Sequence, residues 1–362
     1  MMKKLRIIIA VLVALVYCGE ALACTSAIIS AAKSSEGVPL LWKHRDASTW
    51  NCRVAYVEGE KYGYTALVSL DDKYTYCGIN EKGFAVLNTV SHNIAQTKKG
   101  TLKGSAISLM GVILGECATV DEFEAWLAQS NGERKYVTNY AVGDPSGKAA
   151  YFEVSQDGYV RYDLEKRTEG FDVRANFSFS GDMVKRGPSV PRYEIAKSQI
   201  QSKTTYAPHD FLEFSRNYRN VEGGCVLDNP EKVVVDNSSI ARYIASASAV
   251  MVCDAKNPRM LVAVGLPSAS MGIPVYVKAK NAIPQCVGGT ALLDLCNEVR
   301  AKTYKALTEE TSELNKEMMS KVLTINTVCE MPSTYPDDIQ AFNAKIDKAF
   351  EAHAKLIRRI VE

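Results

Sequence analysis

The sequence is poor in histidine and has no excess of charge of either sign. Its 362 residues include four histidines, at positions 44, 92, 209 and 353, with no close pair among them. A metal site built on histidine is therefore not expected, because such sites need several ligands at close spacing. Lys and Arg number 43 against 41 Asp and Glu. A chain balanced in this way has no bulk attraction for nucleic acid or for an anionic membrane surface.

Long apolar runs are absent except near the start of the chain. There, Ile7–Tyr17 follows Lys3 and Lys4 and precedes the triplet Ala21-Leu22-Ala23. The order of basic start, apolar run and small residues is typical of a secretory signal peptide, and the run is too short to span a bilayer. We therefore predict a signal peptide over residues 1–23 and an exported protein, periplasmic or extracellular, whose mature chain begins at Cys24.

A cysteine directly after a signal peptide also suggests lipidation. Lipoprotein signals usually have an aliphatic residue three positions before the cysteine, and Ala21 occupies that position here. Ordinary cleavage is therefore favoured. The alternative of a lipid-anchored binding protein, with Cys24 carrying the lipid, stays open.

Ten cysteines allow more than one state of oxidation. Eight of them remain when Cys18, in the signal peptide, and Cys24 are set aside: Cys52, Cys77, Cys117, Cys225, Cys253, Cys286, Cys296 and Cys329. An exported protein could join these eight in four disulfides, whereas a chain of this size can also keep them as buried thiols. The sequence leaves both alternatives open.

The order of the expected elements indicates one layered domain. Short apolar or alternating runs predict strands from Thr25 to Thr89, followed by helices over Ser105–Glu116 and Val120–Gln129. Further strands, with a hairpin turn at residues 144–147, lead to helices over Pro191–Gln201 and Pro208–Tyr218. Strands then return from residue 240 to 278. This order favours an α+β fold, with a catalytic domain over residues 24–288 and a helical C-terminal extension over 289–362.

Cleavage before Cys24 would place a thiol and a free α-amine on one residue. A free α-amine has a pKa of roughly 7.7–8.0 and an ordinary thiol about 8.5, so the amine can accept the thiol proton near neutral pH. One residue then provides both the nucleophile and its base, and no catalytic histidine is needed. This is the chemistry of N-terminal nucleophile hydrolases.

Four motifs, in order along the chain, resemble one family of N-terminal cysteine enzymes. They are Cys24-Thr25-Ser26, the segment Trp42–Asp46, the segment Gly78–Asn88, and the hairpin from Tyr140 to Glu153 followed by Asn176. The family includes choloylglycine hydrolases, penicillin V acylases and isopenicillin-N acyltransferases. The resemblance covers about Cys24 to Gly265. It implies an αββα sandwich of two mainly antiparallel sheets covered by helices.

The same resemblance assigns roles to individual residues. Cys24 would be the nucleophile, and Asp46 would orient its α-amine. Asn88 and Asn176 would help to bind the oxyanion of the tetrahedral intermediate. Arg242 is the candidate for a late active-site arginine. No metal or organic cofactor is implied.

One position departs from the motif of the family. Lys43 lies three residues before Asp46, where the family has arginine, and Arg45 is the neighbouring alternative for the cationic role. We expect Lys43 and Arg45 to give electrostatic support, because lysine lacks the planar fork of arginine. His44 occupies an asparagine position of the motif and is given no catalytic role.

The implied activity is cleavage of a non-peptide C–N amide bond in an N-acylated small molecule, through a thioester. An N-acyltransferase and a cysteine dipeptidase are the enzymatic alternatives. The charged helices after Thr290 also allow a homo-oligomer.

Overall fold

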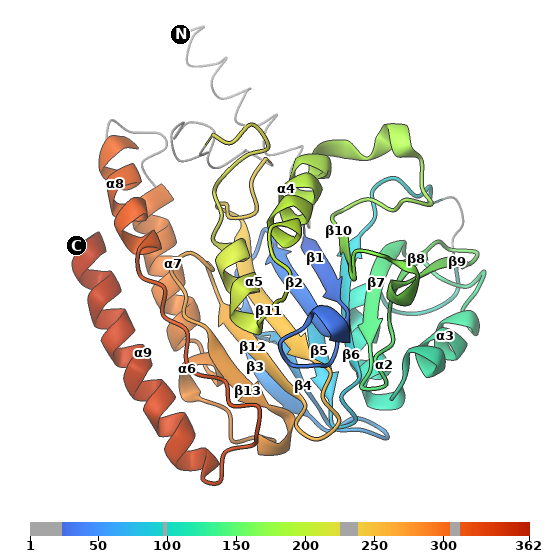
Figure 1. Ribbon diagram of the computed structural model, residues 1–362, viewed down its shortest axis with the longest axis horizontal. Coiled ribbons are helices and arrows are strands. Elements are labelled where there is room, and N and C mark those ends of the chain that lie inside the picture. The colour runs from blue at the N-terminus through green and yellow to red at the C-terminus, as the bar shows by residue number, and fades with distance from the viewer. Residues whose placement is uncertain (1–23, 97–99, 225–237, 305–311) are drawn as a thin grey trace, which may run out of the picture.

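The computed structural model describes residues 24–96, 100–224, 238–304 and 312–362. The predicted signal peptide, Cys18 and Cys225 lie outside these residues. Two antiparallel sheets form the centre of the molecule (Figure 1). The first has the strand order β10-β1-β2-β11-β12-β13, and the second runs from β3 to β9 in sequence order. The strands are β1 (Thr25–Ile29), β2 (Leu40–Asp46), β3 (Cys52–Val57), β4 (Tyr64–Ser69), β5 (Thr75–Asn80), β6 (Ala85–Val90), β7 (Thr138–Gly143), β8 (Ala149–Val154), β9 (Tyr159–Asp163), β10 (Phe171–Arg174), β11 (Ala245–Val252), β12 (Arg259–Val264) and β13 (Ile273–Tyr276).

Helices cover the outer face of each sheet. The helices α2 (Ala106–Glu116) and α3 (Val120–Ala128) pack on β5, β6 and β7 of the second sheet. The helices α4 (Val190–Gln201) and α5 (Pro208–Ser215) pack on β10, β1, β2 and β11 of the first sheet. One hydrophobic cluster fills the space between the sheets, and two others lie beneath these helix pairs. The predicted α+β fold, an αββα sandwich, is therefore confirmed.

Local sequence explains where several of these elements begin and turn. Ser105 and Ser108 form a reciprocal capping box at the start of α2, and the Thr119 hydroxyl accepts a hydrogen bond from the Glu122 backbone at the start of α3. In the turn between β7 and β8, Asp144 accepts from the Ser146 backbone at 2.8 Å, and Gly147 has φ +98°. That backbone angle is one that glycine adopts without steric cost. The hairpin predicted around residues 144–147 is present.

The C-terminal helices pack along one side of the molecule. These are α6 (Gln285–Gly288), α7 (Ala291–Tyr304), α8 (Ser312–Leu323) and α9 (Ile339–Val361). Figure 1 places α7, α8 and α9 beside β12 and β13, on the opposite side from α3 and β9. Apolar residues of α7 and α9 share the hydrophobic cluster that fills the space between the sheets. Among the described residues, no helix is long and apolar enough to cross a membrane.

The strand β2 includes the polar segment 43–46, in which Lys43 and Asp46 have long-range partners. The strand β10 ends at Arg174, and β11 begins at Ala245, after a loop that contains Arg242. The eight described cysteines are free thiols, seven of them buried, so no disulfide joins any two of them. Burial in apolar surroundings accounts for these thiols without cross-links.

Candidate active site

The strands β1 and β2 place the predicted site residues on two faces of one sheet. They pair antiparallel, with Thr25 opposite His44 and Ser26 opposite Lys43. Because side chains alternate along a strand, Lys43 and Arg45 point between the sheets, and His44 and Asp46 point toward the helices. Contacts agree with this alternation, since the Arg45 guanidinium lies 3.7 Å from the centre of the Tyr76 ring of the second sheet. One strand therefore carries its cations and its carboxylate on opposite faces.

On the helix side, Asp46 is completely buried and pairs with Arg242. The Arg242 Nε and Nη2 atoms both donate to Asp46 Oδ2, the first at 3.1 Å. His44 Nε2 lies 3.2 Å from Asp46 Oδ1. Burial alone would raise the pKa of the Asp46 carboxyl, but the Arg242 guanidinium, followed by His44, outweighs burial and lowers that pKa to about 2. Asp46 is thus held as a carboxylate.

On the inner side, Lys43 joins the two sheets. Its Nζ atom lies 2.9 Å from Asn88 Oδ1 on β6 and 2.7 Å from the Tyr76 backbone oxygen on β5. Asn88 Nδ2 in turn donates to Thr138 Oγ1 at 3.2 Å. Arg45 Nη1 instead donates a hydrogen bond to Ser246 Oγ at 2.5 Å. Of the two cations, Lys43 is therefore the one that contacts a predicted oxyanion residue.

Arg192 is a buried residue of this site that the sequence analysis did not identify. From α4, its Nη1 donates to the Cys24 backbone oxygen at 2.8 Å and to Thr25 Oγ1 at 2.9 Å, and its Nη2 donates to Asn176 Oδ1 at 2.8 Å. Burial, and then the nearby Arg242 charge, lower the pKa of Arg192. An arginine nevertheless stays protonated at neutral pH. Arg192 thus connects Cys24 directly to Asn176.

A periodic signal for Arg192 was present in the sequence. Ile195, Ala196 and Ile200 follow it at spacings of three, four and eight, which are the positions of one helix face. A charged side chain within such an apolar stripe must find a buried partner. The helix itself was predicted, but its buried arginine was not.

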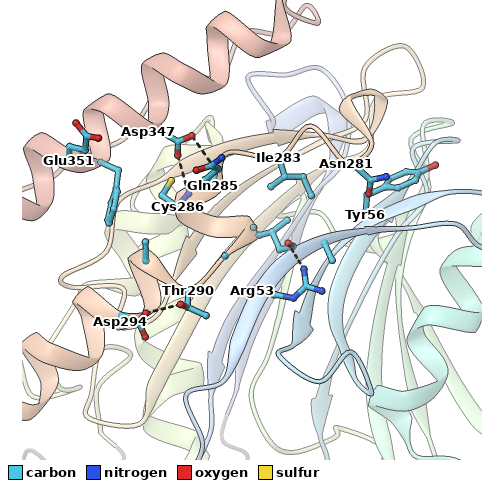
Figure 2. A pocket seen from close by; sticks show the side chains of 16 residues that line it. Arg53, Tyr56, Asn281, Ile283, Gln285, Cys286, Thr290, Asp294, Asp347 and Glu351 are labelled. Carbon is cyan, nitrogen blue, oxygen red and sulfur yellow. Dashed lines mark hydrogen bonds between the residues drawn. The ribbon is translucent and has the colours of Figure 1, made fainter.

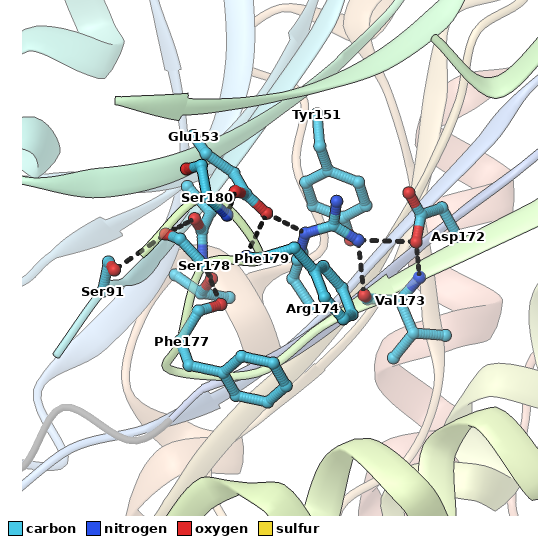
Figure 3. A network of polar contacts seen from close by, with 12 residues as sticks. Ser91, Tyr151, Glu153, Asp172, Val173, Arg174, Phe177, Ser178, Phe179 and Ser180 are labelled. Carbon is cyan, nitrogen blue, oxygen red and sulfur yellow. Dashed lines mark hydrogen bonds and ion pairs between the residues drawn. The ribbon is translucent and has the colours of Figure 1, made fainter. Parts of the chain in front are cut away.

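A network of polar contacts holds the segment that carries Asn176. Figure 3 shows the Arg174 guanidinium between Glu153 and Asp172, with the Tyr151 and Phe179 rings on either side. Its Nε donates to Glu153 Oε1 at 2.8 Å, and the Glu153 carboxylate also accepts from the Phe179 and Ser180 backbones, at 2.9 and 2.7 Å. This buried ion pair therefore fixes the chain on the C-terminal side of Asn176.

Asn176 itself is held at three points. Its side-chain oxygen accepts from Arg192, its side-chain nitrogen donates to the Val90 backbone oxygen at 3.2 Å, and its backbone oxygen accepts from His92 at 3.0 Å. Both asparagines predicted to bind the oxyanion thus have their side-chain oxygen bound by an N–H group of a buried basic side chain, Lys43 for Asn88 and Arg192 for Asn176. Because the oxygen of each amide is bound, the orientation of the amide is fixed, and with it the direction in which its nitrogen donates hydrogen bonds.

The structure contains one cavity away from the predicted site residues and another beside the segment bonded to Asn176. A cavity of about 830 Å³ opens among β3, α6 and α9, where Asp347 accepts from the Gln285 and Cys286 backbones (Figure 2). None of the predicted site residues lines it. A second cavity, of about 690 Å³, is lined by His92, Asn93 and Ser180, among others. It adjoins the segment that is hydrogen-bonded to Asn176.

The structure therefore brings most of the predicted residues together near the start of β1. Arg192 links Cys24 to Asn176, Lys43 contacts Asn88, and Asp46 and Arg242 form a pair on the helix side of β2. Trp42 lies outside this group. It packs beneath α5 and donates to Ser215 and Ser248, so it belongs to the core.

No protein-family model and no curated protein matches the sequence. Similar solved structures include a variant of conjugated bile acid hydrolase from Clostridium perfringens, 11% identical, with a TM-score of 0.45 over 73% of this chain and 94% of that one. Penicillin V acylase from Agrobacterium tumefaciens is 17% identical, with a TM-score of 0.44 over 69% and 86%. A Caenorhabditis elegans ortholog of N-acylethanolamine-hydrolyzing acid amidase is 15% identical, with a TM-score of 0.42 over 63% and 92%. These names fall within the group of enzymes that the sequence motifs resemble.

Proposed function

We propose that the protein is an exported N-terminal cysteine amidohydrolase that cleaves the amide bond of an N-acylated small molecule. The observations that carry this proposal are the contact of Arg192 with both the Cys24 carbonyl and Asn176, and the contact of Lys43 with Asn88. A nucleophile, two oriented amide donors and a buried cation are the groups that acyl transfer through a thioester requires.

The reaction proceeds in two halves. The Cys24 α-amine accepts the thiol proton, and the thiolate attacks the amide carbon to give a tetrahedral oxyanion. Asn88 and Asn176 stabilise the oxyanion, and the C–N bond breaks as the amine leaves with the proton. Water then adds to the thioester, and the carbon–sulfur bond breaks to release the acid and the thiol. An amine in place of water would make the same enzyme an acyltransferase.

Maturation is part of this proposal. In the full chain, the Cys24 nitrogen belongs to the peptide bond with Ala23, so cleavage between these residues must precede turnover. We infer that removal of the signal peptide performs this step during export. The intact mass and N-terminal sequence of the exported protein test it, because a chain that begins at unmodified Cys24 is required. A lipid on the Cys24 sulfur or nitrogen would contradict both the maturation and the mechanism.

The activity is tested on a panel of amides that differ in acyl group and amine. Penicillin V, a conjugated bile acid, an N-acylethanolamine, an N-acyl amino acid and an unmodified dipeptide are incubated with the mature protein, with and without an acceptor amine. Release of the free acid, abolished in Cys24→Ala but retained in Lys148→Arg on the surface, would support the proposal. Full activity of Cys24→Ala would overturn it. An amide product that depends on the acceptor would instead indicate a transferase, and cleavage of dipeptides alone would indicate a dipeptidase.

A further inference from the structure

Lys43 is a buried lysine without an acidic partner. Its side chain is 3% exposed, and the Nζ atom donates to two neutral oxygens, those of Tyr76 and Asn88. In the described part of the chain, the charged or ionisable groups that act on it are Cys24, Cys77 and Arg45, with no carboxylate among them. A buried ammonium that lacks a countercharge is costly, so the neutral amine is favoured at such a position.

The hydrogen bonds of Lys43 suit the neutral amine. A neutral amine has two N–H donors and one lone pair, and the two oxygens of Tyr76 and Asn88 account for both donors. An ammonium at the same place would have a third donor to satisfy. The lone pair of the neutral form is therefore left to accept a proton.

The nucleophile lies on the same face of the sheet. Ser26 is opposite Lys43 in the ladder and points between the sheets, where its hydroxyl lies 2.9 Å from the Tyr151 hydroxyl. Extending the alternation by two residues places Cys24 on this face as a diagonal neighbour of Lys43, within reach of a long side chain. Electrostatics agrees with this placement. Burial lowers the pKa of Lys43, and the strongest opposing influence is the negative charge that Cys24 would carry as a thiolate.

We propose that Lys43, in place of the Cys24 α-amine, is the catalytic proton carrier of the reaction described above: it accepts the thiol proton of Cys24 and delivers it to the leaving amine. This inference rests on the proposed function of Cys24 as the nucleophile. In the first step the S–H bond breaks and an N–H bond forms on Nζ, giving a thiolate beside an ammonium. In the second step the ammonium returns that proton to the departing nitrogen as the C–N bond breaks. The arginine found at this position in the family motif would supply the charge alone, because it does not release its proton.

The test compares an amide with an ester of the same acyl group. A p-nitroanilide needs a proton on its leaving nitrogen, whereas p-nitrophenolate leaves without one. We measure hydrolysis of both butyryl compounds by the mature wild type, Lys43→Arg and, as a matched surface control, Lys148→Arg. General acid catalysis contributes about 10²–10⁴-fold. We therefore expect Lys43→Arg to lower the ratio of amide to ester turnover about 100-fold or more, and Lys148→Arg to leave it unchanged. A change below about threefold in Lys43→Arg would overturn the proposal.

A second readout does not depend on turnover. The rate at which iodoacetamide alkylates Cys24 at pH 7 should fall at least about tenfold in Lys43→Met and in Lys43→Gln, because the thiol loses its proton acceptor. Circular dichroism confirms that each variant is folded, and the glutamine variant retains N–H donors on a side chain that is one atom shorter and not basic. An unchanged alkylation rate in a folded variant would overturn the role of Lys43. If neither butyryl compound is cleaved while alkylation still depends on Lys43, the amidase proposal fails and the proton transfer stands.

Discussion

Arg242 donates two hydrogen bonds to a single carboxylate oxygen of Asp46, although 196 residues separate them in the sequence. Both side chains are almost fully buried, so neither charge has water as an alternative partner. This ion pair therefore holds the loop before β11, which carries Arg242, against the end of β2, which carries Asp46. Breaking a buried pair from one side leaves an isolated charge in the core, which typically costs about 3–5 kcal/mol.

Asp46 should make the stability of the protein depend on pH in acid. Its pKa of about 2 in the folded state lies below the ordinary value of 3.8, so its contribution is complete above that ordinary value and is lost as the pH falls toward 2. The size of the shift corresponds to about 2 kcal/mol. Urea unfolding at pH 6 and pH 2.5 should show that Asp46→Asn, although less stable overall, loses about 1.5 kcal/mol less than the wild type on acidification, because the folded carboxyl is still mostly ionised at pH 2.5. An equal loss in both proteins would contradict the assignment, and Asp121→Asn on the surface is the control.

Replacing Asn88 should lower kcat, whereas replacing Asn80 should lower the free energy of unfolding. Losing an oxyanion donor typically lowers kcat by about 10²–10³-fold, and we expect this from Asn88→Ala with little change in KM. Asn80 instead donates to the Leu114 and Cys117 backbone oxygens at the end of α2, at 2.8 and 2.7 Å. Its replacement by alanine should lower the free energy of unfolding by about 1–3 kcal/mol and leave kcat nearly unchanged. Kinetics and urea unfolding of both variants check this, and the opposite pattern would exchange the two roles.

Arg192 should act on catalysis through Asn176. We expect Arg192→Met to lower kcat at least about tenfold, because the Asn176 amide loses the bond that orients it. In the Asn176→Ala background the same substitution should have a smaller effect, giving a coupling of roughly 0.5–3 kcal/mol in a double-mutant cycle. Additive effects would show that Arg192 acts on kcat independently of Asn176. The variant Arg134→Met, which removes another buried arginine that bonds loop carbonyls, serves as the control for lost burial alone.

The buried Arg174–Glu153 ion pair should contribute more to the free energy of unfolding than an exposed ion pair does. Glu153→Gln weakens an ion pair and two backbone hydrogen bonds at once, so we expect a loss of about 3–5 kcal/mol. Thermal unfolding measures it. If the exposed ion pair between Arg53 and Asp72 proved equally important in Asp72→Asn, burial would not be the cause.

The elements that the sequence predicted well are those fixed by local pattern. Alternating apolar residues located most strands, and Thr119 and residues 144–147 marked a helix start and a turn. Motif resemblance singled out Cys24, Asp46, Asn88, Asn176 and Arg242. The structure pairs Asp46 with Arg242, joins Cys24 to Asn176 through Arg192 and places Lys43 on Asn88, and the chemical roles of these residues stay predictions.

The features that could not be predicted depend on long-range contacts. The partners of Lys43 and Asp46 at the end of β2 could not be predicted, because Tyr76, Asn88 and Arg242 lie far along the chain. The partners of Arg192, Cys24 and Asn176, could not be predicted either, because they lie in other elements of the fold. Whether Lys43 or Arg45 faces the oxyanion residues depends on how the second sheet stacks on the first, and strand periodicity does not contain that information.

The alternation along β2 has a consequence for how this chain can vary among related proteins. Shifting the strand by one residue would turn Lys43 and Arg45 toward the helices and bring Asp46 between the sheets. Single replacements in β2 change the contacts of one side chain, but an inserted or deleted residue exchanges both faces at once. We therefore expect relatives of this protein to replace the buried residues 40–42 only by apolar residues of similar volume, and to keep the number of residues between Cys24 and Asp46 compatible with the same pairing of β1 and β2.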